Sequence, residues 1–314
     1  MFIKAHRQLS PALDFTRQEY LSIQAGLLSS YIQPEGQGQP LLFIHSINAA
    51  ASSYEMRPLA LHYAGKRPVY VLDLPGYGFS ERSRRTYNPT LFTHAISDFV
   101  DHVIKQPVDA VALSLSCEFL GFAALARPSM FRSLAFISPT GFSHSPMPGG
   151  NQGIHDLLSF PLWSQGLYNA LVSRGSLRYF LQMSFSGPVD EGLVAYAYET
   201  SHQPGARYAP LSFVSGQLFT PLIRPQVYER LKQPGLILFD EDPNIRFDAI
   251  PEHLQRHSNW QAARISGTRG LPHWEKLTET VTQLEAFWEG AALAAAPATA
   301  GSRSGTTWSG HDAS

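Results

Sequence analysis

The stretch that decides the fold is residues 111–126, which read VALSLSCEFLGFAALA. Its first part is a short apolar run of the kind that forms a buried parallel strand. After Ser114 to Ser116 the chain resumes as an apolar segment rich in helix-forming residues. A strand that turns sharply into a helix with a serine at the turn is typical of a nucleophile elbow, and we place Ser116 at its apex.

The local pattern around Ser116 matches an elbow only on one side. Backbone and helix crowd together at such a turn, so the residues two before and two after the nucleophile should be small. Ser114 meets that requirement and Glu118 does not. An ordinary strand-to-helix turn is the alternative for this stretch.

The composition of the 314-residue chain is that of a folded globular protein, with 44% hydrophobic and 16% charged residues. A formal net charge of −1 gives no electrostatic footprint for nucleic acid. The single cysteine, Cys117, excludes an intrachain disulfide and a CxxC metal site. We see neither a signal peptide nor an apolar run long enough to span a membrane, so we expect a cytoplasmic protein.

Apolar runs along the chain alternate with helical patterns. We expect helices over residues 53–64 and from about residue 89, where Asn88 is a capping residue and Pro89 the first helical position. Continuously apolar strands that alternate with helices predict an α/β fold, a mostly parallel sheet covered by helices on both faces. Besides the elbow strand, the predicted strands are 20–23, 27–32, 41–44, 69–72, 134–137, 236–239 and 262–266.

The alternation is interrupted between residues 142 and 225, which carry helical segments and turns but no buried strand pattern. We therefore predict an α/β core formed by residues 18–141 and 226–290, with 142–225 as a helical insertion. Residues 291–314 consist largely of Ala, Gly, Ser and Thr, which predicts a disordered tail.

Residues suited to acyl chemistry follow three of the predicted strands. Because ligands of open parallel sheets bind beyond the carboxyl ends of the strands, such residues can converge. Ser116, Asp242 and His273 provide a nucleophile, an orienting acid and a base.

With these residues in view, residues 18–290 resemble the α/β-hydrolase family. Residues 41–46, LLFIHS, resemble its strand ending in His-Gly, and 73–80, DLPGYGFS, resemble its D-x-P-G-x-G-x-S turn. Residues 238–243, LFDEDP, resemble the strand end that supplies the acid, and 270–275, GLPHWE, resemble the histidine loop. The resemblance implies the α/β-hydrolase fold, with residues 142–225 as the lid.

The resemblance also assigns roles to particular residues. It implies an oxyanion hole formed by the backbone N–H groups of Ile47 and Cys117, and it implies no metal or organic cofactor. The acid loop is one residue shorter than in the family pattern, so Asp240 and Asp248 are alternatives to Asp242.

We therefore predict a serine hydrolase that cleaves an apolar, uncharged small-molecule acyl substrate, such as a carboxylic ester, through an acyl-enzyme. Hydrolysis of a carbon–carbon bond, lactone opening, thioester hydrolysis and acyl transfer are alternatives on the same triad. A binding protein that kept the fold and lost turnover is another, favoured by Glu118 and the short acid loop. We expect neighbouring hydroxyl or backbone donors to hold the Glu118 carboxylate. The sequence indicates neither the substrate's identity nor the oligomeric state.

Overall fold

A computed structural model describes residues 9–145 and 149–295, and in them one eight-stranded sheet forms the centre of the molecule. The strand order is β1-β2-β4-β3-β5-β6-β7-β8. The strands are β1 (Thr16–Ser22), β2 (Gly26–Gln33), β3 (Leu41–Ile44), β4 (Val69–Asp73), β5 (Val108–Leu113), β6 (Phe131–Ile137), β7 (Gly235–Phe239) and β8 (Trp260–Arg264).

The sheet is antiparallel at one edge and parallel elsewhere. Strand β2 pairs antiparallel with both β1 and β4, whereas all pairs from β4 to β8 are parallel. The predicted mostly parallel sheet is confirmed. Its carboxyl ends bring the loops after β3, β5, β6 and β7 to one edge, where the predicted site residues lie.

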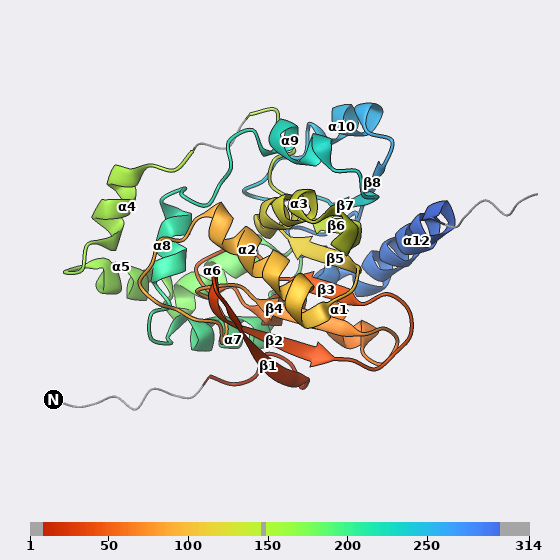
Figure 1. Ribbon diagram of the computed structural model, residues 1–314. Helices are drawn as coiled ribbons and strands as arrows, with labels where there is room; N and C mark the ends of the chain where they lie inside the picture. Colours follow the sequence, from red (N-terminus) through yellow and green to blue (C-terminus); the bar gives the residue numbers. More distant parts are fainter. Residues whose placement is uncertain (1–8, 146–148, 296–314) are drawn as a thin grey trace, which may run out of the picture.

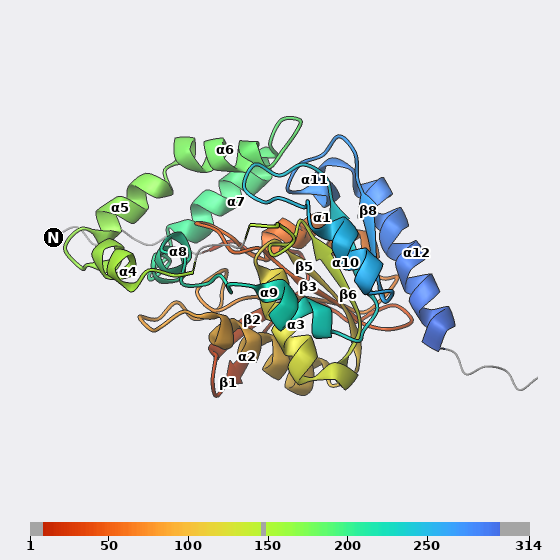
Figure 2. The same cartoon turned by 90° about the horizontal axis from the view of Figure 1, so that it is seen from above.

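Helices cover both faces of the sheet, and the alternation of side chains along β3 shows why (Figures 1 and 2). Leu42 and Ile44 pack in one apolar cluster with α2 (Pro89–Phe99) and α3 (Ser116–Ala126). Leu41 and Phe43 pack in a second cluster with α1 (Arg57–Tyr63) and α12 (Leu277–Ala295). A central strand such as β3 therefore needs apolar residues at every position, as the continuous runs indicated.

Shorter helical turns connect these elements. They are η1 (Ser53–Met56), η2 (Val100–Ile104), η3 (Pro128–Met130), η4 (Tyr228–Arg230), α10 (Ile250–Arg256) and α11 (Pro272–Glu275). Asn88 caps α2 as predicted, because its side chain accepts a hydrogen bond from the Leu91 N–H.

The chain between β6 and β7 is helical where the structure describes it. Its helices are α4 (Gln152–Ser159), α5 (Ser164–Leu171), α6 (Arg174–Met183), α7 (Glu191–Ser201), α8 (Tyr208–Val214) and α9 (Ile223–Gln226). Figure 2 shows α4 to α8 grouped beside the sheet rather than stacked on its helical layers. Tyr168 and Leu177 belong to a small apolar cluster that includes Ala50 of the loop after β3. The Tyr168 hydroxyl also donates to the Ala49 carbonyl at 3.0 Å, so this segment is attached to the edge of the sheet where strand β3 ends.

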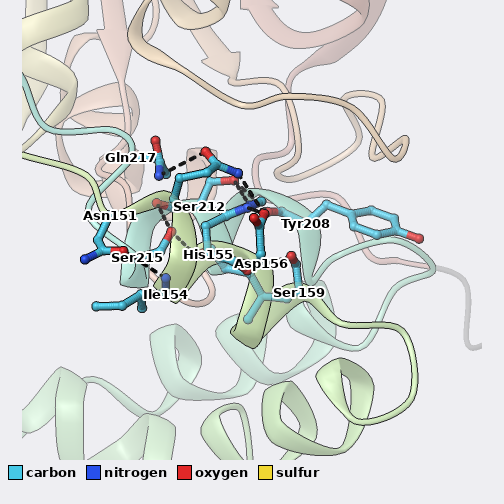
Figure 3. Close-up of polar contacts among 11 residues, drawn as sticks. Asn151, Ile154, His155, Asp156, Ser159, Tyr208, Ser212, Ser215 and Gln217 are labelled. Atoms are coloured by element: carbon cyan, nitrogen blue, oxygen red, sulfur yellow. Dashed lines mark hydrogen bonds and ion pairs between the residues drawn. The ribbon is translucent and has the colours of Figure 1, made fainter.

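Polar contacts join α4, the first helix of this segment, to α8 (Figure 3). The Asn151 side chain caps α4 by accepting from the Ile154 N–H, and the Asn151 N–H donates to the Ser215 carbonyl at 3.2 Å. His155 Nε2 lies 3.3 Å from Ser212 Oγ of α8. The start of α4 is therefore fixed against α8.

The predicted boundary of the C-terminal tail is wrong at its first residues. Helix α12 continues through residues 291–295, and Ala291 is 8% exposed. Alanine is the strongest helix former, so the alanine-rich sequence extends the helix beyond Trp288. The rest of the predicted tail, residues 296–314, lies outside the described residues. No helix in the described chain is both long and apolar enough to cross a membrane.

A buried ionic cluster fixes the start of β5, the strand that leads into the elbow. The Asp109 carboxylate is fully buried and accepts hydrogen bonds from Arg67, Arg132 and Ser133. We expect Asp109→Ala to lower the free energy of unfolding by about 3–5 kcal/mol, because it removes the buried carboxylate to which the partly buried Arg67 and Arg132 are paired. Denaturant unfolding monitored by circular dichroism measures the loss.

Asp101→Ala is the matched control for this variant. Asp101 pairs with Arg127, whose side chain is 51% exposed, and such surface pairs contribute at most about 1 kcal/mol. Equal, small losses in the two variants would contradict the role assigned to Asp109.

Candidate active site

The junction between β5 and α3 has the geometry of an elbow, and Ser114 is its apex. Ser114 adopts φ +55°, in the left-handed region that non-glycine residues rarely occupy. Its N–H donates to the Ile137 carbonyl at 2.8 Å, and its own carbonyl accepts from the Cys117 N–H at 3.2 Å. The Ser114 side chain is partly exposed. A strained, accessible serine at the carboxyl end of a central strand is suited to act as a nucleophile.

The prediction that Ser116 is the apex is wrong, by two residues. Ser116 is the first residue of α3, is fully buried, and donates its hydroxyl to the His45 carbonyl at 2.6 Å. A hydroxyl buried in this way cannot reach a substrate. The sequence signal for Ser114 was the small residue on each side of it, since Ala112 precedes it by two positions and Ser116 follows it by two.

The same shift removes Cys117 from the predicted oxyanion hole. Its N–H is bonded to the Ser114 carbonyl, and its thiol donates to the Ala112 carbonyl at 3.3 Å. Burial, with the nearby Glu118 carboxylate, raises the pKa of the thiol well above its usual value, so it stays protonated. The residue after Ser114 is Leu115. In the described part of the chain, neither the Leu115 nor the Ile47 N–H donates a hydrogen bond.

The loop that carries Ile47 is held in place by buried polar contacts. His45 Nε2 accepts from the Leu74 N–H at 3.0 Å, and burial lowers the pKa of this histidine. The Glu55 carboxylate accepts from the Ser46 N–H at 2.8 Å and from the Asn48 amide at 2.7 Å. Together with the Ser116–His45 bond, these contacts position the Ile47 N–H next to the elbow.

The turn at residues 73–80 supports this loop and has no free catalytic group. The Asp73 carboxylate accepts from the N–H groups of Ser53 and Phe79, both at 2.9 Å. Gly78 has φ +52°, and a Cβ at this position would lie 1.9 Å from Asp73 Cγ. Glycine is therefore required where the backbone closes over the carboxylate.

The predicted base, His273, lies in α11 and is fully buried. Its Nε2 lies 2.8 Å from the Glu55 carbonyl, and its Nδ1 has no partner among the described residues. Burial lowers the pKa of His273 to about 4, although the Glu55 carbonyl acts in the opposite direction. The imidazole is therefore neutral at pH 7, as a general base must be.

Of the three candidate acids, Asp242 lies at the histidine loop. One of its oxygens accepts from the Asn244 and Ile245 N–H groups at 2.8 and 2.9 Å. The other would lie 2.7 Å from a Cβ placed on Gly270, three residues before His273. Burial raises the pKa of Asp242.

The two alternatives, Asp240 and Asp248, are bound elsewhere. Asp240 is paired with Arg264 and accepts from the Thr268 N–H, and these bonds outweigh the effect of burial and lower its pKa. Asp248 lies 3.5 Å from Arg246. Within residues 9–145 and 149–295, no hydrogen bond directly links Ser114, His273 and Asp242 to one another.

Glu118 is held as the sequence predicted. Its side chain is fully buried; one oxygen accepts from the Thr140 hydroxyl at 2.5 Å and the other from the Thr220 N–H at 2.8 Å. Burial raises the pKa of Glu118 to about 7, and the two threonines limit the rise. The carboxylate is therefore held by the loop after β6, which carries Thr140, and by the end of the helical segment, which carries Thr220.

Thr140 and Thr220 also line a cavity of about 260 Å³. It lies where the loop after β6, the end of the helical segment and the loop after β7 meet. Its apolar residues are Leu222, Ile223, Pro225 and Ile245, and its polar residues include Ser143, Asn244, Arg224 and Arg246. Asn244 and Ile245 are the residues that bind Asp242, so the cavity adjoins the loop of the acid.

Comparisons with known proteins agree with this architecture. The sequence model described as "Alpha/beta hydrolase family" matches residues 41–298. Among curated proteins, the dihydrolipoyllysine-residue acetyltransferase component of the acetoin cleaving system of Cupriavidus necator is 29% identical over 199 residues. That match covers 59% of this chain and 52% of the relative, so the chain spans about half the relative's length.

Two solved structures illustrate the similarity in fold. A serine hydrolase involved in carbazole degradation superposes with a TM-score of 0.70 at 14% identity, over 87% of this chain and 99% of the other. A meta-cleavage product hydrolase from Pseudomonas fluorescens IP01 gives 0.67 at 16% identity, over 87% and 98%. At these identities the similarity establishes the fold alone.

The raised pKa of Glu118 predicts a pH-dependent effect of Glu118→Gln on stability. Between the usual carboxyl pKa and about 7, the folded state binds the proton that the unfolded state releases, so wild-type stability falls as pH rises through this window. Glutamine keeps both contacts, because its oxygen can accept from Thr220 and its amide can donate to Thr140. We expect the melting temperature of Glu118→Gln, relative to wild type, to be higher at pH 8 than at pH 5.

Thermal unfolding followed at several pH values measures this difference. Glu289→Gln, in the exposed surface of α12, is the control and should track wild type throughout. A constant offset between Glu118→Gln and wild type from pH 5 to 8 would contradict the account of Glu118.

Proposed function

Because the chain belongs to the α/β-hydrolase family, we propose that it is a serine hydrolase with Ser114 as nucleophile, His273 as base and Asp242 as orienting acid. The observation that carries the proposal is the left-handed, partly exposed Ser114 at the end of β5. The neutral, buried His273 and the position of Asp242 at the histidine loop support the other two roles.

In the proposed reaction, Ser114 Oγ attacks the carbonyl carbon of the substrate while the imidazole of His273 takes the hydroxyl proton. The oxyanion that forms is stabilised by the free N–H groups of Ile47 and Leu115. The imidazolium then protonates the leaving group as its bond to carbon breaks, which leaves an acyl-enzyme. His273 next accepts a proton from water, whose oxygen attacks the acyl carbon and releases the acid and Ser114.

In the present arrangement His273 Nε2 carries the ring proton, because the Glu55 carbonyl can only accept. For this reaction the imidazole must leave the Glu55 carbonyl and carry its proton on Nδ1, so that Nε2 can accept the proton of the Ser114 hydroxyl. Hydrogen bonds of catalytic groups are often formed only in the substrate complex, so the geometry of the free protein is compatible with the step. The Asp242 oxygen at Gly270 would then pair with the imidazolium and favour the charged form.

We propose an uncharged acyl substrate with an apolar acyl or alcohol part, such as a carboxylic ester. The apolar part of the cavity, formed by Leu222, Ile223 and Ile245, adjoins the loop of Asp242, whereas Ser114 and His273 are not among the residues that line it. We also propose that residues 142–225 act as a lid, because Thr220 binds Glu118 from this segment and Tyr168 binds the loop after β3.

A non-catalytic binding protein is the second candidate, and one observation favours it. His273 Nε2 is engaged by the Glu55 carbonyl, and Trp274 Nε1 donates to the same oxygen at 2.7 Å. If these bonds never open, Ser114 lacks a base. A fluorophosphonate probe separates the two candidates, because phosphonylation needs an activated serine whatever the substrate.

We expect Ser114→Ala to abolish fluorophosphonate labelling and to reduce turnover by about 10³-fold or more. Ser116→Ala should still be labelled. It should lose about 1–3 kcal/mol of stability, because the buried His45 carbonyl loses its donor. In-gel fluorescence and denaturant unfolding measure the two effects. Loss of labelling in Ser116→Ala with retention in Ser114→Ala would show that the assignment of the nucleophile is reversed.

The low pKa of His273 predicts that the rate of fluorophosphonate labelling falls only at unusually low pH. A base with a pKa of about 4 stays neutral far below the usual histidine range, so the initial rate of labelling should change little from pH 8 to pH 5.5. The profile is also measured in Glu118→Gln, because a carboxyl with a pKa of about 7 can add an inflection of its own. A half-maximal rate near pH 6.5 in both proteins would show that His273 is solvated or is not the base.

A further inference from the structure

Away from the elbow, Glu229, His253 and His257 form a compact group of metal-binding side chains. Glu229 belongs to η4, His253 to α10, and His257 follows α10 directly. One potential ligand atom from each residue lies within 4.8 Å of the other two. The two histidines are four residues apart and therefore lie on the same side of the helical turn, with ring centroids 4.7 Å apart.

His253 supplies an independent reason to expect a ligand here. It is 1% exposed, and neither of its ring nitrogens has a hydrogen-bond partner among the residues that the structure describes. Phe142 and Trp260 contact its ring at centroid distances of 5.1 and 5.2 Å in edge-on geometry, so aromatic carbon surrounds a polar group. A buried donor and a buried acceptor without partners destabilise the folded state, and a metal ion would remove part of this cost.

The charge of this group suits a divalent cation, and the Arg224 guanidinium competes with such an ion for the Glu229 carboxylate. Glu229 provides one negative charge and its side chain is 29% exposed, which leaves an approach from solvent. Arg224 Nε lies 3.5 Å from Glu229 Oε1. Arg224 also lies 4.0 Å from Glu252 and donates to the Ala249 carbonyl, so it keeps partners when Glu229 binds a metal.

We propose that Glu229, His253 and His257 bind a zinc-like divalent transition-metal ion, with water as the fourth ligand. Two imidazoles and one carboxylate are a ligand set that Zn²⁺ commonly uses, and they suit it better than Mg²⁺ or Ca²⁺, which prefer oxygen. Bonds of about 2.0–2.2 Å in a tetrahedron require ligand atoms about 3.3 Å apart, so a pair of ligand atoms at the 4.8 Å limit must approach by about 1.5 Å when the ion binds.

The position of this site indicates a structural role. Residues 228–230 follow the helical segment immediately before β7, and α10 connects β7 to β8. Figure 1 shows α9 and α10 together at the top of the molecule, and Arg224 links them. A metal ion bound to both η4 and α10 would fix the residues just before β7, where the chain re-enters the sheet after the helical segment, against α10. This role is independent of the proposed hydrolase function.

The test uses the full chain without an affinity tag, first stripped of metal with a chelator. Zn²⁺ is titrated against a chromophoric chelator of micromolar affinity, and thermal unfolding is measured with and without the ion. We expect one Zn²⁺ per chain and a higher melting temperature in its presence. His257→Ala and Glu229→Gln, both at partly exposed positions, should each weaken binding at least about tenfold.

His102→Ala is the matched control, since His102 is an exposed histidine on η2 and should not affect binding. His253→Ala is left aside because a buried position can change folding. Zn²⁺ binding that is equal in the parent, His257→Ala and Glu229→Gln would overturn the proposal. So would a parent protein that fails to compete with the chelator or gains no thermal stability from Zn²⁺.

Discussion

The hydrogen bond from Ser116 Oγ to the His45 carbonyl joins the two loops on which the candidate site depends. One loop follows β5 and carries Ser114; the other follows β3 and carries Ile47. These strands are neighbours in the sheet, but their loops diverge beyond it, and a buried 2.6 Å bond fixes their separation. Ser116 therefore holds the loops of the proposed nucleophile, Ser114, and of the proposed oxyanion donor, Ile47, against each other.

Burial governs the chemistry of the side chains around this bond. It keeps His45 and His273 neutral, keeps the Cys117 thiol protonated, and raises the pKa of Glu118. The buried carboxylates near the elbow are each held by hydrogen-bond donors. Glu55 and Asp73 accept from backbone N–H groups, and Thr140 and Thr220 hold the Glu118 carboxylate on the side of the cavity.

The sheet could be predicted from the sequence because its signal is local: each central strand is a short apolar run followed by a turn. The elbow could not be placed as well, because two serines two residues apart both fit a strand-to-helix turn. Only the backbone conformation of Ser114 and the burial of Ser116 separate them. The choice among the three candidate acids also needed tertiary information. Asp240 is paired with Arg264, which lies on the neighbouring strand β8. The start of the predicted tail, residue 291, was misplaced because an alanine-rich sequence suits both a helix and a tail.

The central claim is that the reactive serine is Ser114. Peptide mass spectrometry of the unsubstituted protein after reaction with a fluorophosphonate locates the adduct directly. The account predicts a single phosphonyl group on Ser114. An adduct on Ser116, or a folded protein that acquires none, would contradict it.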